Sequence, residues 1–192
     1  MQLLGGLFIT IVIAIFLGLG ATWYTTVRGV SFGGVTSGAW TAWPKSGTQD
    51  IEPYARAAMA RSGELPLGSG DGVAFRASGD DSGRPFDGRC VVTLAGTTPL
   101  ARYWTLTLYD RDGNLVPNAV GRHGFTSLEI VRASDGTFAI TVSPQARPGN
   151  WLPSGGIDRY QLVLRLYDTA VGVATRAGRE TPMPSVRTEG CP

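Results

Sequence analysis

The hydrophobic positions of this chain form one long uninterrupted run, followed by several short alternating runs. Residues 3–24 contain no charged side chain. At roughly 1.5 Å per residue they form a helix of about 33 Å, which is long enough to cross a bilayer. We therefore predict an uncleaved single-pass membrane anchor over residues 1–27. A cleaved secretory signal is the alternative, although such signals carry a basic n-region and a shorter apolar core.

Small residues recur at every fourth position within the apolar run and lie along one ridge of the predicted helix. Small side chains allow membrane helices to approach closely. The ridge therefore predicts packing against another membrane helix, in a homodimer or with a partner protein. It consists of Gly6, Thr10, Ala14, Gly18 and Thr22.

The amino-acid composition of the chain changes after the apolar run. Residues 28–47 are rich in Gly, Ser and Thr, which predicts a flexible stalk. Residues 48–192 have the size of one domain with a single core. An amphipathic helix is expected at its start, with Asp50 as N-cap, Pro53 in the first turn and Gly63 after the last turn.

Beyond this helix, apolar and polar residues alternate in four short runs. Each run has one core face and one more polar face, as an antiparallel sheet requires. Asp112-Gly113 and Asp135-Gly136 are hairpin turn signals between such runs. The pattern predicts a mainly β fold, a jelly-roll-like antiparallel β-sandwich with one N-terminal helix. The predicted inward-facing residues are Cys90, Val92, Leu94, Trp104, Leu106, Leu108, Phe138, Ile140, Val142, Leu162, Leu164 and Leu166.

The two cysteines bear on the cellular compartment. Cys90 and Cys191 have no neighbouring His or further Cys, which excludes a structural zinc site. They are either disulfide-bonded or two unrelated thiols. A bridge would fix the chain end and requires an oxidising compartment. We therefore expect a bacterial inner-membrane protein with a periplasmic domain, although Arg28 after the anchor weakly favours the opposite orientation.

Charge and motifs exclude several classes of function. The net charge of +2 is small and the arginines are scattered, so nucleic acid is not an expected partner. His123 is the only histidine, which excludes metal sites with several His ligands, and no metal or cofactor is expected. No nucleophile elbow, phosphate loop or dinucleotide motif is present. A hydrolase using His123 with a nearby acid remains an alternative.

Two long stretches closely resemble a known protein family. They are residues 103–118, and Asn150-Trp151-Leu152-Pro153 followed by residues 164–167. The chain is similar to the family known as domain of unknown function 1214, and the resemblance extends over residues 50–191. It implies a jelly-roll-like β domain, which often occurs beside a domain of unknown function 1254 that we do not find in this chain. It implies no catalytic role.

The polar face of the predicted sheet supplies the candidate ligand site. Aromatic rings together with one arginine suit a sugar or a small anion, because a guanidinium can bind a carboxylate or phosphate through two hydrogen bonds. The structural alternative is that these residues only complete the fold. We predict a non-catalytic, membrane-tethered envelope domain that binds a protein partner, a glycan or a small anionic ligand; a purely structural subunit is the other possibility. The candidate residues are Tyr103, Tyr109, Arg165, Tyr167, Asn150 and Trp151.

Overall fold

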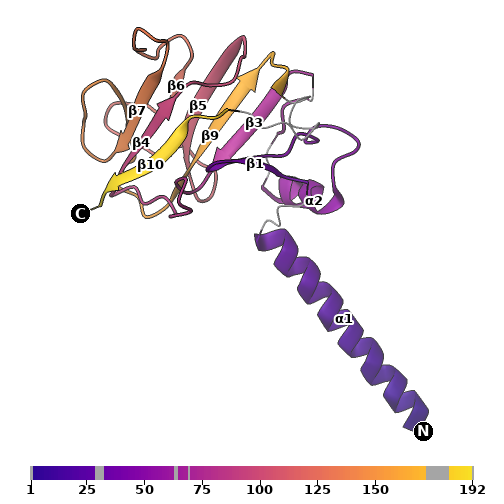
Figure 1. The fold of residues 1–192 in the computed structure, drawn as a ribbon. Helices are drawn as coiled ribbons and strands as arrows, with labels where there is room; N and C mark the ends of the chain where they lie inside the picture. The colour runs from indigo at the N-terminus through magenta and orange to yellow at the C-terminus, as the bar shows by residue number, and fades with distance from the viewer. Residues whose placement is uncertain (1, 29–32, 63–64, 69, 172–181, 192) are drawn as a thin grey trace.

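The computed structural model describes residues 2–28, 33–62, 65–68, 70–171 and 182–191. A long helix, α1 (Gln2–Arg28), projects away from a β-rich domain that also carries a short helix, α2 (Pro53–Ser62) (Figure 1). The strands are β1 (Val35–Ser37), β2 (Trp40–Ala42), β3 (Gly72–Ala77), β4 (Val91–Gly96), β5 (Tyr103–Asp110), β6 (Gly124–Thr126), β7 (Phe138–Ser143), β8 (Asn150–Pro153), β9 (Tyr160–Tyr167) and β10 (Ser185–Gly190).

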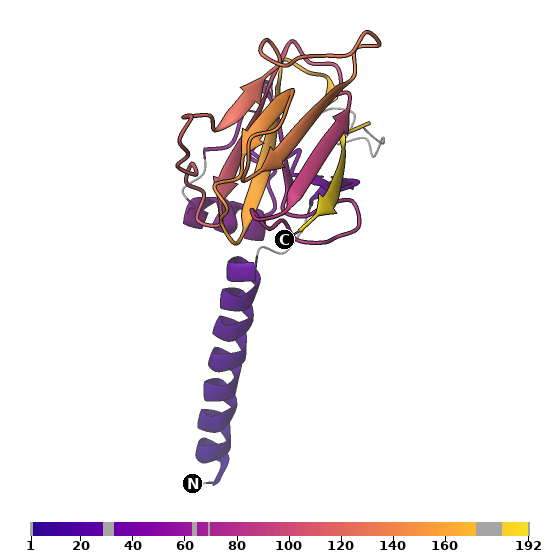
Figure 2. The same ribbon diagram turned by 90° about the vertical axis from the view of Figure 1, so that its left-hand side faces the viewer.

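The strands form two sheets, as expected for a mainly β domain. One sheet has six strands in the order β1-β2-β3-β9-β5-β6, and the other has four in the order β10-β4-β7-β8. The two sheets lie face to face above the long helix (Figure 2). All pairings are antiparallel except that of β7 with β8, which is parallel.

The core lies between the two sheets. The residues predicted to face inward from the four alternating runs are all buried, which confirms those runs as strands with one core face. Trp104 of the six-stranded sheet meets Phe138 of the four-stranded sheet with ring centroids 5.5 Å apart. Each fully buried Leu, Val or Ile contributes roughly 1.5–3 kcal/mol through removal of apolar surface from water.

The segment predicted as a flexible stalk is structured over much of its length. β1 and β2 pair with each other, and β2 joins the edge of β3. Trp40 is completely buried, and its Nε1–H donates a hydrogen bond of 2.8 Å to the Pro184 carbonyl. The stalk prediction is therefore wrong for residues 35–42, while residues 29–32 lie outside the described residues.

Helix α2 confirms the predicted N-terminal helix of the domain, but its cap differs from the expected one. The Glu52 carboxylate accepts a hydrogen bond of 3.0 Å from the Ala55 amide. Glu52 therefore takes the capping role that we assigned to Asp50, because the helix begins at Pro53. Gly63, expected after the last turn, lies outside the described residues.

Both predicted turns form, but they do not connect the strand pairs expected. At Asp112-Gly113 the chain folds back to the isolated bridge between Tyr109 and Leu115. At Asp135-Gly136 the Ala133 amide donates to the Thr137 carbonyl. The long strands on either side of these turns, β5 and β7, belong to different sheets.

Helix α1 has the length and composition of a membrane-crossing helix. The apolar span covers Leu3–Val27 with a mean hydropathy of 2.6, and none of its most apolar stretch is buried against the domain. Two threonines of the small-residue ridge bond back to the helix, Thr10 to the Gly6 carbonyl and Thr22 to the Gly18 carbonyl. Their hydroxyls are thereby satisfied without water, as an apolar environment requires.

Candidate functional site

The outer face of the six-stranded sheet brings four of the predicted site residues together. β5 and β9 are neighbours, and Tyr103 lies directly opposite Tyr167 with ring centroids 5.9 Å apart. Further along the same face, Arg165 Nη1 donates to the Tyr109 hydroxyl at 3.3 Å. The guanidinium also lies 5.5 Å from the Tyr109 ring centroid. All four side chains are half-buried.

A second arginine, Arg76 on β3, lies on this face and was missed by the sequence analysis. It is diagonal to Arg165, because Arg76 pairs with Val163 and Ala74 pairs with Arg165. Burial, and then the positive charge of Arg165, lower the pKa of Arg76. Two guanidinium groups thus share a partly desolvated surface, where an added anion would relieve their repulsion.

A hollow of about 800 Å³ opens where this face ends. It lies next to Tyr109, because Gln161 in its wall is paired with Tyr109. Two further arginines, Arg111 after β5 and Arg159 before β9, also contribute to the wall. A volume of this size is typical of small-molecule sites. We call this space the first hollow.

Two aspartates in the wall of the first hollow hold the surrounding loops in place. Asp81 accepts hydrogen bonds from the Ala39 amide at 3.0 Å and the Val186 amide at 2.8 Å. Asp80 accepts the backbone amides of Ser82 and Arg84, both at 3.0 Å. Burial alone would raise the pKa of Asp80, but these bonds and the one from the Ser82 hydroxyl lower it to about 2.

The cationic side chains in and beside the first hollow that form no ion pair are arginines. Within the described part of the chain, Arg111, Arg159 and Arg165 form no ion pair. Arg111 and Arg159 are exposed, so their guanidinium groups are free to turn toward a bound anion. The first hollow therefore combines fixed carboxylate acceptors with guanidinium donors that have no carboxylate partner.

Asn150 and Trp151 lie elsewhere, on β8 of the four-stranded sheet. The Asn150 amide is buried, accepting from the Val131 amide at 2.8 Å and donating to the Val131 and Ala139 carbonyls at 2.8 and 2.9 Å. Trp151 Nε1–H donates to the Ser143 carbonyl at 3.1 Å. The structure thus separates these two residues from the four on the other sheet and gives both of them structural contacts.

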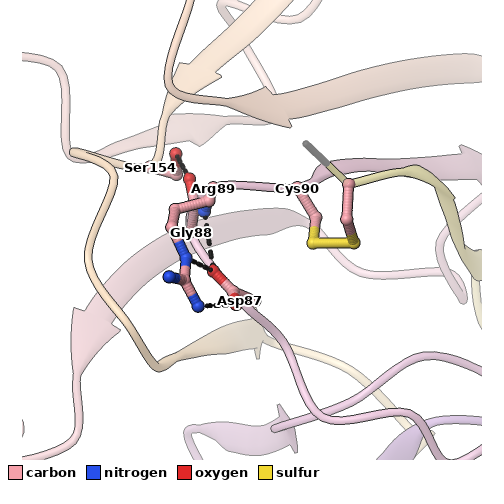
Figure 3. Close-up of polar contacts among 6 residues, drawn as sticks. Asp87, Gly88, Arg89, Cys90 and Ser154 are labelled. Atoms are coloured by element: carbon pink, nitrogen blue, oxygen red, sulfur yellow. Dashed lines mark hydrogen bonds and ion pairs between the residues drawn. A yellow bond between two sulfur atoms is a disulfide. The ribbon is translucent and has the colours of Figure 1, made fainter.

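The two cysteines form a disulfide between the start of β4 and the chain end after β10, 101 residues apart (Figure 3). Beside it, Arg89 folds over Asp87 and donates from Nε at 2.9 Å and from Nη2 at 2.6 Å (Figure 3). The Ser154 hydroxyl donates to the Gly88 carbonyl. These contacts make the segment before β4 a rigid corner of the domain.

Among the residues that the structure describes, His123 has none of the side-chain partners of a catalytic triad. Its Nδ1 lies 3.0 Å from the Val116 carbonyl, which can only accept, so Nδ1 carries the hydrogen. No Ser or Asp side chain bonds to His123 in the described ranges. The same residues contain no group of three or more His, Cys, Asp or Glu arranged to hold a metal ion.

Comparisons with solved structures identify the fold. The chain resembles the VPA0106 protein from Vibrio parahaemolyticus with a TM-score of 0.62 at 19% identity, covering 90% of this chain and 43% of that protein. An uncharacterized protein from Burkholderia cenocepacia matches with a TM-score of 0.45 at 17% identity, covering 88% and 40% respectively. The chain therefore spans less than half the length of either protein, and at these identities only the likeness to the Vibrio protein shows the fold.

Comparison of the sequence with known protein families shows the family to which it is related. None of the curated proteins matches the chain. One family model, described as protein of unknown function (DUF1214), matches residues 71–171. This range includes β5 and β9, the strands that carry the four candidate residues of the six-stranded sheet. That range covers more than half of the sequence and confirms the predicted resemblance. The chain belongs to the DUF1214 family.

Proposed function

We propose that this protein is a single-pass membrane protein whose β domain binds a small anionic ligand in the first hollow. The observation that carries the proposal is that Arg111 and Arg159 line a space of about 800 Å³ beside Tyr109, whose hydroxyl accepts a hydrogen bond from a third arginine, Arg165. None of the three forms an ion pair or hydrogen bond with a carboxylate among the described residues. A carboxylate or phosphate would supply that partner.

The arrangement favours binding over chemistry. A guanidinium presents parallel N–H donors that match both oxygens of a carboxylate. Arg165 donates one N–H to the Tyr109 hydroxyl at 3.3 Å. This is a long hydrogen bond, which a charged acceptor can displace. Tyr109 then supplies its hydroxyl as a further donor to the same ligand. Asp81 is exposed and accepts one backbone amide on each carboxylate oxygen, which leaves lone pairs for ligand hydroxyl groups.

Helix α1 supports a role at a membrane. Its exposed apolar surface cannot be satisfied by the β domain, because none of its most apolar stretch packs against it. The disulfide between Cys90 and Cys191 requires an oxidising compartment. We therefore assign the β domain to the periplasmic side of a bacterial inner membrane, where it would meet ligands outside the cytoplasm.

Ligand binding can be measured by calorimetry on the full chain in nanodiscs, with galacturonate and inorganic phosphate as probes. We expect binding by the wild type and a loss of about tenfold in Arg165→Gln, because a hydrogen bond to a charged group contributes roughly 1.5–3 kcal/mol. Arg102→Gln is the matched control, since Arg102 pairs weakly with Asp168 at 3.7 Å and is exposed. No binding of either probe, or equal losses in both variants, contradicts the proposal.

The small-residue ridge on α1 supports a second part of the proposal, contact with another membrane helix. Gly18 has open space around its Cα, so Gly18→Ile does not disturb the single helix sterically. It would, however, keep a second helix away. Gly20→Ile is the control on the opposite side of α1, and it too has open space. Unchanged association of Gly18→Ile in a membrane association assay would remove this part of the proposal.

A further inference from the structure

Two smaller hollows around the disulfide lie beside the first hollow. The second hollow, of about 420 Å³, shares Pro85 and Arg159 with the first. The third, also of about 420 Å³, shares Arg89 and Cys191 with the second. Because neighbouring hollows have wall residues in common, the three lie side by side along the surface. We call this row of hollows the arginine trough.

Guanidinium groups occur along the whole length of the arginine trough. Arg111 and Arg159 line its first hollow, Arg84 its second and Arg147 its third. All four are exposed, and their side chains form no hydrogen bond or ion pair with any residue that the structure describes. Arg89 differs from them, because Asp87 neutralises it through two hydrogen bonds.

The carboxylates of the trough distinguish among negatively charged partners. Asp80 and Asp81 lie in the first hollow and Asp87 in the second. A nucleic acid carries a phosphate at every unit and would meet these carboxylates as well as the arginines. An acidic polysaccharide carries hydroxyl groups between its carboxylates, and hydroxyls donate readily to carboxylate oxygens. A wall of alternating sign therefore fits an acidic sugar chain better than a nucleic acid.

The combined size of the three hollows also favours a polysaccharide over a single sugar. The first hollow alone has the volume of a complete small-molecule site. The two further hollows would remain empty if the ligand were one monosaccharide, although they carry two more unpaired guanidinium groups. A ligand with carboxylates at regular intervals could place one against each of these arginines.

We infer that the arginine trough binds an acidic polysaccharide chain, with one sugar acid in the first hollow and the following units passing Arg159 toward Arg147. This inference rests on the proposed function, because it assigns the anion of the first hollow to one unit of such a chain. It adds that affinity grows with chain length. It also adds that Arg84 and Arg147, which do not line the first hollow, contribute only to binding of the longer ligands.

The test measures affinity against ligand length, using the full chain in nanodiscs with galacturonate, its trimer and its hexamer. The hexamer of thymidylate is the nucleic-acid probe and maltohexaose the neutral one. We expect the galacturonate hexamer to bind at least tenfold tighter than the monomer and tighter than either control ligand. Arg84→Gln with Arg147→Gln should weaken hexamer binding at least tenfold and leave monomer binding unchanged, since the loss of even one charged hydrogen bond costs about tenfold or more.

The matched control is Arg61→Gln with Arg102→Gln, which removes the same charge away from the trough. Arg61 lies in the last turn of α2 and Arg102 just before β5. Equal weakening by both double variants overturns the inference, as does thymidylate binding as tightly as the sugar hexamer. Monomer binding without any gain on lengthening overturns the inference and leaves the proposed function standing. Absence of monomer binding contradicts the proposed function itself.

Discussion

Replacement of Asn150 is expected to cost stability and not ligand binding. Its buried amide forms three hydrogen bonds of 2.8 to 2.9 Å, two with Val131 and one with Ala139. These bonds hold the loop before β7 against β8. At about 1 kcal/mol net for each bond, Asn150→Ala should lower the free energy of unfolding by about 3 kcal/mol. For a domain of this size that corresponds to a fall of roughly 6–12 °C in melting temperature.

The assay is thermal unfolding followed by circular dichroism, with galacturonate calorimetry on the same samples. Asn114→Ala is the matched control. Asn114 is exposed and its side chain forms one long bond of 3.4 Å to Asp110, so its substitution should stay within about 0.5 kcal/mol of the wild type. A fall of less than 2 °C in Asn150→Ala, combined with lost ligand binding, would refute the structural role given to Asn150.

Three further predictions follow from the other contacts. Replacing Cys90 and Cys191 by alanine should lower stability by up to about 4.7 kcal/mol, from the loop entropy of a bridge that joins residues 101 apart; an unchanged urea midpoint would show that the bridge does not constrain the chain. The folded-state pKa of Asp80 lies at about 2, below its ordinary 3.8, so stability present above pH 4 should be lost as the pH falls toward 2. Asp80→Asn should show a smaller loss in that window, and an identical acid unfolding curve argues against the assignment. Tyr109→Phe keeps the ring beside Arg165 but removes the hydroxyl, and should weaken galacturonate binding about fivefold with little change in melting temperature; unaltered affinity would exclude the hydroxyl from the site.

The long strands could be predicted from the sequence because their period is unambiguous. Along β5, Trp104, Leu106 and Leu108 alternate with polar or half-buried residues over eight positions. The same holds for β9, apart from Val163, which is buried on the outer face. A run of this length gives three or four core residues on one face. That is enough to separate a strand from a loop.

The short strands could not be predicted in this way. β1 and β2 have three residues each, which is too few to show any period. Their Gly- and Thr-rich surroundings have the composition of a linker. Trp40 is fixed by Pro184, which lies 144 residues further along the chain, and no local pattern contains that contact. Pairing of this kind comes from the tertiary structure alone.

Alternation also predicted the strand face of some candidate residues, but not the sheet to which each residue belongs. Alternation correctly placed Tyr109 and Arg165 on the polar face of neighbouring strands. Asn150 and Trp151 were grouped with them because sequence order does not reveal that β8 runs parallel to β7 in the other sheet. The first hollow depends on residues from four separate parts of the chain, and no one of these segments carries a recognisable motif.

The central claim is that the hollow beside Tyr109 receives an anionic sugar. Hydrogen–deuterium exchange of the full chain in nanodiscs, with and without the galacturonate hexamer, tests it most directly. The account predicts slower exchange in residues 78–85 and 159–161, which line the first hollow. Residues 98–102, before β5, should exchange at the same rate with and without ligand. Unchanged exchange in both wall segments, or protection confined to residues 98–102, would contradict the account.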